Sequence, residues 1–309
     1  MIPVVVLGVL QWCIRVPLAQ GEATRQHLVS EGALDLSLKV QRVGDHLLLP
    51  VIVQRAGAER CEFEYASPKT ELPRHELVGG IAIMQDNDPI GARQILAARP
   101  SVHTVVVASG EVSGEYRTRE FEILAGDITT RTEVIEYGHR FVVDLTRAYF
   151  SSRLSTERQR VLAQVSSEEK ILDMFAGVGP FAITLAKKAH SVIAADKNPA
   201  AIELMIENLA KNRAKNVLPL LADARHLPEF YAQEFDRIVM NLPLSGTEFL
   251  QEGFALCKPG GMIHFYALVS SEGEHVAHIE RLGGRVIAER VVRSYSPAQW
   301  HVVYDIETT

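Results

Sequence analysis

A glycine turn between a strand pattern and a helix pattern constrains this chain more than any other segment. Residues 173–181 read Asp-Met-Phe-Ala-Gly-Val-Gly-Pro-Phe. An apolar run at residues 170–172 precedes the turn, and an apolar-periodic stretch at residues 181–188 follows it. Because glycine has no side chain, such a strand, turn and helix start lets a ligand lie against bare backbone. The segment therefore predicts a ligand-binding turn, of a kind that also serves nucleotides and flavins.

Polar residues directly follow three later apolar runs. The runs and the residues that follow them are 192–195 with Asp196, 218–222 with Asp223, and 237–240 with Asn241. All of these ends fall on the carboxyl edge of one predicted parallel sheet, which is where open α/β sheets bind ligands. The combination is the pattern of an S-adenosylmethionine-dependent methyltransferase, so we expect S-adenosyl-L-methionine as the cofactor.

The edge residues also have purely structural interpretations. Gly177 and Gly179 let the backbone approach the methionine part of the cofactor, or they only tighten the turn. Asp196 accepts hydrogen bonds from ribose hydroxyls, or it helps to cap the next helix, for which Asn198 is also a candidate. Asp223 accepts from the adenine amino group, or it is a solvated loop acid.

The segment Asn241-Leu242-Pro243 is the most telling part of this edge. A related tetrad of amino-methylating enzymes, Asn or Asp followed by Pro-Pro and an aromatic residue, holds a planar NH-bearing base near the methyl donor. Here leucine separates asparagine from proline, and no aromatic residue follows. The alternative is that Pro243 only ends a strand.

Composition places the chain among ordinary globular proteins and excludes a strongly basic coat. The 309 residues are 47% hydrophobic and 23% charged, with a net charge of −6, which still permits a local basic patch. Cys13, Cys61 and Cys257 form no CxxC pair, so we expect no disulfide framework, no cysteine zinc site and a reducing cytoplasm. We separately expect no metal ion and a monomer. Residues 2–10 are apolar but too few to span a bilayer, so we expect a buried strand there and no membrane association.

The pattern divides the chain into three parts. Residues 1–66 and 74–155 are each predicted to form a small α+β domain, and residues 156–309 carry an alternating β/α pattern. The predicted fold class is α/β, a Rossmann-like class I methyltransferase domain preceded by two smaller α+β domains. The expected helices are 20–31 and 90–98. Outside the sheet core, the expected strands are 34–40, 46–53, 77–84, 102–108, 119–124, 134–144, 285–294 and 301–306.

Several motifs, taken in order, carry a resemblance to a known family. The motifs are residues 114–119 (Gly-Glu-Tyr-Arg-Thr-Arg), 149–158, 173–181, 241–250 and 263–266 (Ile-His-Phe-Tyr). The chain resembles the archaeal and eukaryotic tRNA (guanine-37-N1)-methyltransferases, especially the archaeal form with an extra N-terminal domain, over almost its whole length. Gly80 departs from the usual aspartate of a Gly-Asp-Ile-Ala stretch, and Tyr137 departs from the usual asparagine.

The resemblance implies a role for individual residues. Glu157 is the general base for guanine N1, Arg117 contacts the guanine oxygen, and Asn241 completes the catalytic set. The implied substrate-binding residues are Tyr149, Arg153, Arg158 and Pro243. The implied cofactor-binding residues are Asp173, Phe175, Gly177, Gly179, Asp196, Lys197, Asp223, Ala224 and Asn241. The implied partner is tRNA, with the first domain at its outer corner and the rest at its anticodon loop.

Elementary chemistry agrees with this assignment. Guanine N1 carries a proton and has no available lone pair, so attack on a sulfonium methyl requires proton removal, to which a positioned carboxylate contributes about 10²–10⁴-fold. Negative charge then spreads onto O6, where a guanidinium stabilises it. The structural alternatives are a first-turn helix acid for Glu157 and an exposed strand arginine for Arg117.

A stretch rich in arginine predicts a local basic surface for the anticodon stem, with a solvated charged face as the alternative. Its arginines are Arg140, Arg147, Arg153, Arg158 and Arg160, and its acids are Asp144 and Glu157. Two other functions stay open. One is aminocarboxypropyl or methyl transfer in wyosine synthesis on the same fold, and the other is RNA binding without catalysis.

Overall fold

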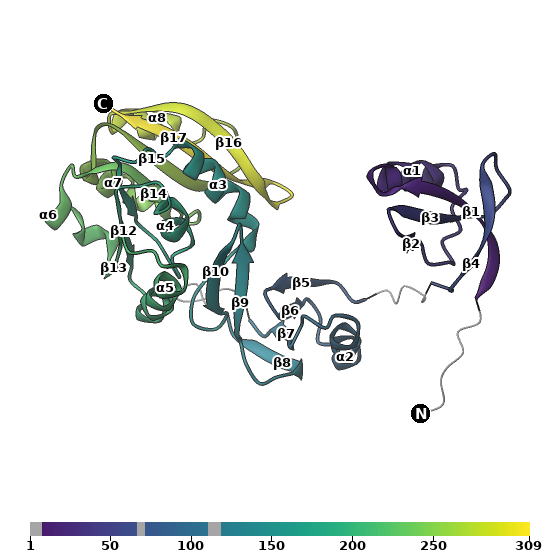
Figure 1. Ribbon diagram of the computed structural model, residues 1–309. Coiled ribbons are helices and arrows are strands. Elements are labelled where there is room, and N and C mark those ends of the chain that lie inside the picture. Colours follow the sequence, from purple (N-terminus) through teal and green to yellow (C-terminus); the bar gives the residue numbers. More distant parts are fainter. Residues whose placement is uncertain (1–7, 67–71, 111–118) are drawn as a thin grey trace. The chain divides into compact units, whose positions relative to one another are not determined.

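The computed structural model of the chain describes residues 8–66, 72–110 and 119–309. The chain divides into two compact units, Met1–Glu71 and Leu72–Thr309, which run from purple to yellow in Figure 1. The further boundary expected at residue 155, within the second unit, stays a prediction. No helix in the described ranges is long and apolar enough to cross a membrane.

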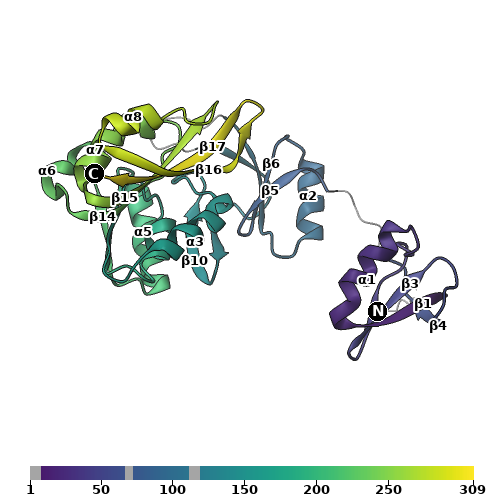
Figure 2. The same ribbon diagram turned by 90° about the horizontal axis from the view of Figure 1, so that it is seen from above.

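The first unit is a four-stranded antiparallel sheet with one helix against it. The sheet order is β2-β3-β1-β4. The elements are β1 (Val9–Pro17), α1 (Leu18–Ser30), β2 (Gln41–Val43), β3 (His46–Val51) and β4 (Ala58–Phe63). Helix α1 lies along the strands (Figure 2) and packs through a core that includes Val16, Leu28 and Leu49.

One strand prediction in this unit is largely untested, and another needs correction. The expected strand 2–10 falls mostly outside the described residues, and the strand that the structure shows there, β1, begins at Val9. The expected strand 34–40 is wrong, because it makes only single bridges at Leu34 and Leu38. Both leucines are buried, but Leu36 between them is 67% exposed, so the apolar alternation does not continue along one face.

The second unit begins with a four-stranded sheet and a hairpin. The sheet order is β5-β6-β7-β8, and β9 pairs with β10. The elements are β5 (His75–Val78), β6 (Ile81–Met84), α2 (Pro89–Ala98), β7 (Thr104–Ala108), β8 (Phe121–Gly126), β9 (Arg131–Glu136) and β10 (His139–Asp144). The expected strand 77–84 is a hairpin, because Gly79 turns the chain at φ 54°. A Cβ at Gly80 would lie 2.4 Å from a ring carbon of His103, which explains the missing aspartate.

A seven-stranded sheet forms the rest of this unit, in the order β13-β12-β11-β14-β15-β17-β16. The strands are β11 (Lys170–Asp173), β12 (Ser191–Asp196), β13 (Val217–Leu221), β14 (Phe235–Met240), β15 (Cys257–Val269), β16 (Gly284–Ser296) and β17 (Gln299–Thr308). The first five in that order run parallel, and β17 and β16 close the sheet as an antiparallel hairpin. This confirms the predicted Rossmann-like fold and its closing hairpin.

Helices cover both faces of this sheet (Figures 1 and 2). The helices on one face are α3 (Ser155–Gln164), α4 (Pro180–Leu185) and α5 (Pro199–Asn212), and those on the other are α6 (Pro228–Tyr231), α7 (Leu250–Leu256) and α8 (Val276–Arg281). Successive strand residues point to opposite faces. Ile171 accordingly packs in one apolar core with Phe181, and Leu172 packs in the other with Leu256.

Candidate active site

The glycine turn lies at the carboxyl edge, between β11 and α4. Gly177 and Gly179 have φ values of 55° and 87°, which only glycine adopts readily. A Cβ at Gly179 would lie 2.8 Å from Cγ of Met205 on α5, whereas a Cβ at Gly177 would meet only the Tyr149 carbonyl oxygen, at 3.5 Å. Gly179 therefore permits close helix packing, whereas Gly177 is required for its backbone conformation rather than for space.

Two buried acceptors at neighbouring strand ends have no partner within the described part of the chain. Asp173 ends β11 and is 1% exposed. Its Oδ2 accepts from the Ala182 amide at 3.1 Å, but Oδ1 is unpaired. Asn241 follows β14, next to β11, and its Oδ1 is also buried and unpaired. Buried polar atoms are normally hydrogen-bonded, so this edge fits a ligand that brings donors.

Burial raises the pKa of Asp173 to about 7, and the nearby Asp196 carboxylate adds to the rise. Asp196 ends β12 and anchors the glycine turn, because its Oδ2 accepts from the Gly177 amide at 2.7 Å. Burial also raises the pKa of Asp196, although hydrogen bonds from three backbone amides and the charge of partly buried Lys197 oppose this. The cap of α5 is Asn198, whose side chain accepts from the Ala200 amide, so Asp196 does not serve as that cap.

Asp223 has a structural role at the end of β13. It caps the short 3₁₀ helix η2 (Ala224–His226) by accepting from the Arg225 amide at 2.9 Å, and it pairs with the Arg225 guanidinium at 3.2 Å. The guanidinium lies 4.6 Å from the ring centre of Phe249, and Phe175 packs edge-on against the same ring. The predicted cofactor-binding residues Phe175, Asp223 and Ala224 therefore lie on one side of the carboxyl edge of the sheet.

Glu157 lies in the first turn of α3 and is held from two sides. Its Oε1 accepts from Arg160 Nη2 and from the Tyr266 hydroxyl, each at 2.7 Å. Tyr266 is on β15, and two residues further along, the Leu268 amide donates to the Pro243 carbonyl at 3.0 Å. One strand thus contacts both Glu157 and the segment Asn241-Leu242-Pro243.

The predicted substrate-binding residues differ in exposure. Tyr149 is 51% exposed, and Arg153 is exposed and pairs with Glu76 at 2.6 Å. Arg158 is 2% exposed and pairs with the buried Glu136 at 2.6 Å. Its guanidinium also donates to the Ser151 carbonyl at 3.1 Å. Arg158 therefore supports the backbone of this segment from inside. Arg117 lies outside the described residues.

Acidic partners offset the charge of the expected local basic surface. Each of its arginines has an acidic partner, and Arg158 and Arg160 are largely buried. The pairs are Arg140 with Glu133, Arg147 with Glu203, Arg153 with Glu76, Arg158 with Glu136, and Arg160 with Glu157 and Asp305. All of the partners except Glu157 lie outside residues 140–160, so counting acids along the stretch could not find them.

Sequence reasoning missed the groups that hold Glu157. The sequence pattern places Arg160 in the basic surface, and it places His264 and Tyr266 in a motif without giving either a role. The contact with Arg160 could have been predicted from the sequence, because Glu157 and Arg160 lie three residues apart on one helix face. The contribution of Asp305 from the last strand has no local signal.

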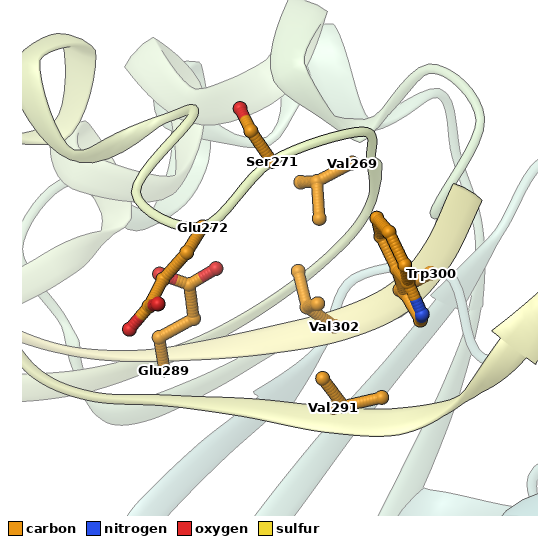
Figure 3. Close-up of a pocket in the computed structure, with 7 residues that line it drawn as sticks. All are labelled: Val269, Ser271, Glu272, Glu289, Val291, Trp300 and Val302. Atoms are coloured by element: carbon orange, nitrogen blue, oxygen red, sulfur yellow. The ribbon is translucent and has the colours of Figure 1, made fainter. Parts of the chain in front are cut away.

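Two further features lie outside the predicted site. A pocket of about 390 Å³ (Figure 3) lies between the end of β15 and the β16–β17 hairpin, and no predicted site residue lines it. In the first unit, the Sγ atoms of Cys13 and Cys61 lie 2.6 Å apart, close to Glu59. Two thiolates on one zinc ion are about 3.8 Å apart for Zn–S bonds of about 2.3 Å, and Arg15 pairs with Glu59, so this cluster does not fit a metal.

The sheet order, the glycine turn and the unpaired acceptors at the carboxyl edge define the class of Rossmann-like methyltransferases. Residues 132–291 match the TRM5/TYW2 methyltransferase domain, and residues 13–59 match the tRNA methyltransferase 5 N-terminal domain. The chain belongs to the TRM5/TYW2 methyltransferase family.

Three relatives show how far the similarity extends. Trm5b of Pyrococcus abyssi, a tRNA (guanine(37)-N(1))-methyltransferase, is 36% identical over 96% of this chain and 98% of its own length. Its crystal structure has a TM-score of 0.74 at 35% identity, over 96% of this chain and 99% of that chain. A solved complex of aTrm5 with tRNALeu has a TM-score of 0.72 at 29% identity, over 96% and 99%. A tRNA(Phe) (4-demethylwyosine(37)-C(7)) aminocarboxypropyltransferase of Methanocaldococcus jannaschii is 31% identical over 75% of this chain and 96% of its own length.

Proposed function

We propose that this chain transfers the methyl group of S-adenosylmethionine to N1 of guanosine 37 in tRNA. The observation that carries the proposal is that Glu157 and Pro243 both hydrogen-bond to β15, through the Tyr266 hydroxyl and the Leu268 amide. A carboxylate that can accept a proton and a segment that can bind a planar nucleobase suit removal of a ring N–H proton next to a methyl donor. The full-length similarity to tRNA (guanine(37)-N(1))-methyltransferases supports the same substrate.

The cofactor is S-adenosylmethionine, which supplies an electrophilic methyl group and leaves as neutral S-adenosylhomocysteine. The unpaired Oδ1 of Asp173 suits the donors of its methionine part, which also approach the bare backbone at Gly177 and Gly179. Asp196 and Lys197 serve the ribose side. Phe175, Asp223 and Ala224 form the wall for the adenine.

The reaction needs one proton removed and one bond exchanged. Glu157 takes the N1 proton, the freed N1 pair bonds to the methyl carbon, and the methyl–sulfur bond breaks. The guanine stays neutral after transfer, with the proton on Glu157. Arg117, placed by the resemblance, stabilises negative charge on O6 as the proton leaves.

The substrate is held by residues of the same edge. Asn241 and Pro243 bind the edge of the flipped guanine, and exposed Tyr149 offers a ring for stacking. Arg153 contributes charge towards the phosphate backbone, whereas buried Arg158 acts by fixing the Ser151 carbonyl. The first unit contacts the outer corner of the tRNA. We propose that the enzyme acts as a monomer in the cytoplasm.

The wyosine-pathway reaction is the second candidate, because a relative with that activity shares the fold. The aminocarboxypropyltransferase, however, covers 75% of this chain, whereas Trm5b covers 96%. The match of residues 13–59 to the tRNA methyltransferase 5 N-terminal domain favours the first candidate.

Nucleoside mass spectrometry tests the proposal. Unmodified tRNA transcripts with guanosine or adenosine at position 37 are incubated with S-adenosylmethionine and digested. The expected product is 1-methylguanosine from the first transcript and none from the second. An aminocarboxypropyl adduct, or methylation at another position, would contradict the proposal.

A further inference from the structure

A chain of buried polar groups runs behind Glu157 and joins α3 to strands β15 and β17. Arg160 pairs with Glu157 on one side and with Asp305 on the other, at 2.7 Å and 2.6 Å. Asp305 lies 145 residues after Arg160, on β17. The side chains of Glu157 and Asp305 are 11% and 6% exposed. The contacts are therefore shielded from solvent. Electrostatic interactions in such a buried position are stronger than in water.

The two oxygens of the Glu157 carboxylate are not equivalent. Oε1 accepts three hydrogen bonds, from Arg160 Nε at 2.9 Å, from Arg160 Nη2 at 2.7 Å and from the Tyr266 hydroxyl at 2.7 Å. Oε2 accepts one, from Arg160 Nε at 3.0 Å. An oxygen with three donors is a poor proton acceptor, so Oε2 is the more basic position.

Arg160 is held by a second, bidentate carboxylate. Its Nη1 donates to Asp305 Oδ2 at 2.6 Å, and its Nη2 donates to Asp305 Oδ1 at 3.0 Å. A guanidinium between two carboxylates shares its charge between them. Without Asp305, the whole charge of Arg160 would fall on Glu157 and reduce its tendency to accept a proton.

His264 fixes Asp305 in turn. Arginine only donates, so the contact at 2.7 Å from Arg237 Nη1 makes His264 Nε2 an acceptor. Burial lowers the pKa of His264, which leaves a neutral ring with its proton on Nδ1. That proton is donated to Asp305 Oδ1 at 2.6 Å. His264 and Asp305 are directly opposite each other on β15 and β17, so the sheet register sets this contact.

We propose that Arg160 and Tyr266 are positioning residues that leave Oε2 of Glu157 to take the N1 proton. Asp305, held by His264, limits how far Arg160 neutralises that oxygen. The inference rests on the proposed function, because it assigns the machinery behind the proposed base. It also gives the antiparallel closing strand β17 a part in the chemistry.

Other titratable groups near Glu157 do not change charge in the same range. His301 on β17 packs against the Tyr266 ring, with ring centres 5.8 Å apart. Burial, followed by the charge of Arg293, lowers the pKa of His301 to about 4. Burial and the neighbouring Glu157 raise the pKa of Tyr266 well above 10. His301 and Tyr266 thus stay neutral around neutral pH.

The test is the pH dependence of single-turnover 1-methylguanosine formation by the full chain at saturating tRNA and cofactor. Tyr266→Phe removes a donor that favours the ionised carboxylate, so the acidic limb of the profile should move to higher pH. Asp305→Asn removes the second carboxylate, so the positive charge of Arg160 acts on Glu157 alone. The acidic limb of the pH profile should then move to lower pH, while the plateau rate falls. The plateau of Tyr266→Phe should fall about 10-fold, less than the about 10²–10⁴-fold expected for loss of the base itself.

Two further variants separate positioning from general stability. Arg160→Lys keeps the positive charge but loses the planar set of N–H donors. It should lower the plateau rate by about 10²-fold, because Glu157 is no longer held in the same orientation. Tyr304→Phe is the matched control, since Tyr304 is a buried tyrosine that packs against Phe265 and His275. It should leave the profile unmoved.

The outcomes separate this inference from the proposed function. A wild-type enzyme that forms no 1-methylguanosine overturns both. An active wild type whose Tyr266→Phe and Asp305→Asn variants lose rate equally at every pH overturns the positioning inference alone. If Asp305→Asn does not fold, Tyr266→Phe decides, because it removes only one hydroxyl.

Discussion

We expect Asp173 to couple cofactor binding to protonation. Burial raises its pKa to about 7, so near neutral pH the carboxyl is partly protonated in the cofactor-free protein. S-adenosylmethionine brings positive charge to this edge, which favours the ionised form. Binding should therefore lower the pKa of Asp173 again and release a proton.

Calorimetry of S-adenosylmethionine binding in two buffers of different ionisation enthalpy measures that proton. Below pH 7 the wild type should release up to one proton, and the release should vanish well above pH 7, where Asp173 is already ionised. Asp173→Asn should release fewer protons than the wild type and bind more weakly. Asp223→Asn should keep the release, because burial of Asp223 is outweighed by its Arg225 contacts, which leave its pKa lowered. Identical apparent enthalpies in both buffers at acidic pH would contradict this role of Asp173.

At the scale of residues, the sequence identified the ends of the parallel strands but not what occupies each side chain. Asp173, Asp196 and Asn241 lie at neighbouring strand ends because the parallel sheet aligns them. The prediction that Asn198 caps α5 is confirmed, but the sequence did not show that Asp223 caps η2. It also could not find the partners of Arg158 and Arg160, because a fold brings charges together across long sequence separations.

The turn between β11 and α4 depends on one glycine for packing as well as conformation. Gly179→Ala should cost about 1–2 kcal/mol for the positive φ and about 1–3 kcal/mol more for the contact with Met205. Gly260 has a similar φ of 74°, and a Cβ added there would meet no atom within 4 Å. Gly260→Ala should therefore lower stability only by the cost of the positive φ. Urea unfolding and S-adenosylhomocysteine affinity compare the two variants. Equal destabilisation would show that Met205 moves aside.

At the scale of elements, the strands of the large sheet were predictable because each parallel strand is a continuous apolar run. The closing hairpin was predictable from its alternation. The N-terminal strands were less so. The expected strand 34–40 has buried Leu34 and Leu38, but these residues pack under the sheet without joining a ladder. The spacing of apolar residues predicts which side chains are buried. A strand forms only where a neighbouring strand supplies backbone hydrogen-bond partners.

At the scale of the whole molecule, the two compact units predict separable functions. Residues 1–71 and 72–309 each have their own apolar cores. Deleting residues 1–71 should leave a folded protein that binds S-adenosylhomocysteine as the full chain does, with weaker tRNA affinity. Its single-turnover rate at saturating enzyme should stay close to that of the full chain. Calorimetry and filter binding check the two affinities, and loss of cofactor binding would contradict the separation.

The net charge of −6 also belongs to this scale. Because the arginines of residues 140–160 are paired with acids, tRNA binding cannot rest on a continuous basic face there. Recognition by shape and by a flipped base fits such a surface better than broad electrostatic attraction.

The central claim is that Glu157 removes the N1 proton of guanosine 37, and the single-turnover rate of Glu157→Gln tests it most directly. At saturating tRNA and cofactor and neutral pH, the rate should fall by about 10²–10⁴-fold, with both affinities near wild type. Raising the pH should partly restore the rate, since solvent can then take the proton. Glu168→Gln, the same change at an exposed residue beyond α3, should keep the wild-type rate. A Glu157→Gln enzyme that forms 1-methylguanosine at the wild-type rate would contradict the account.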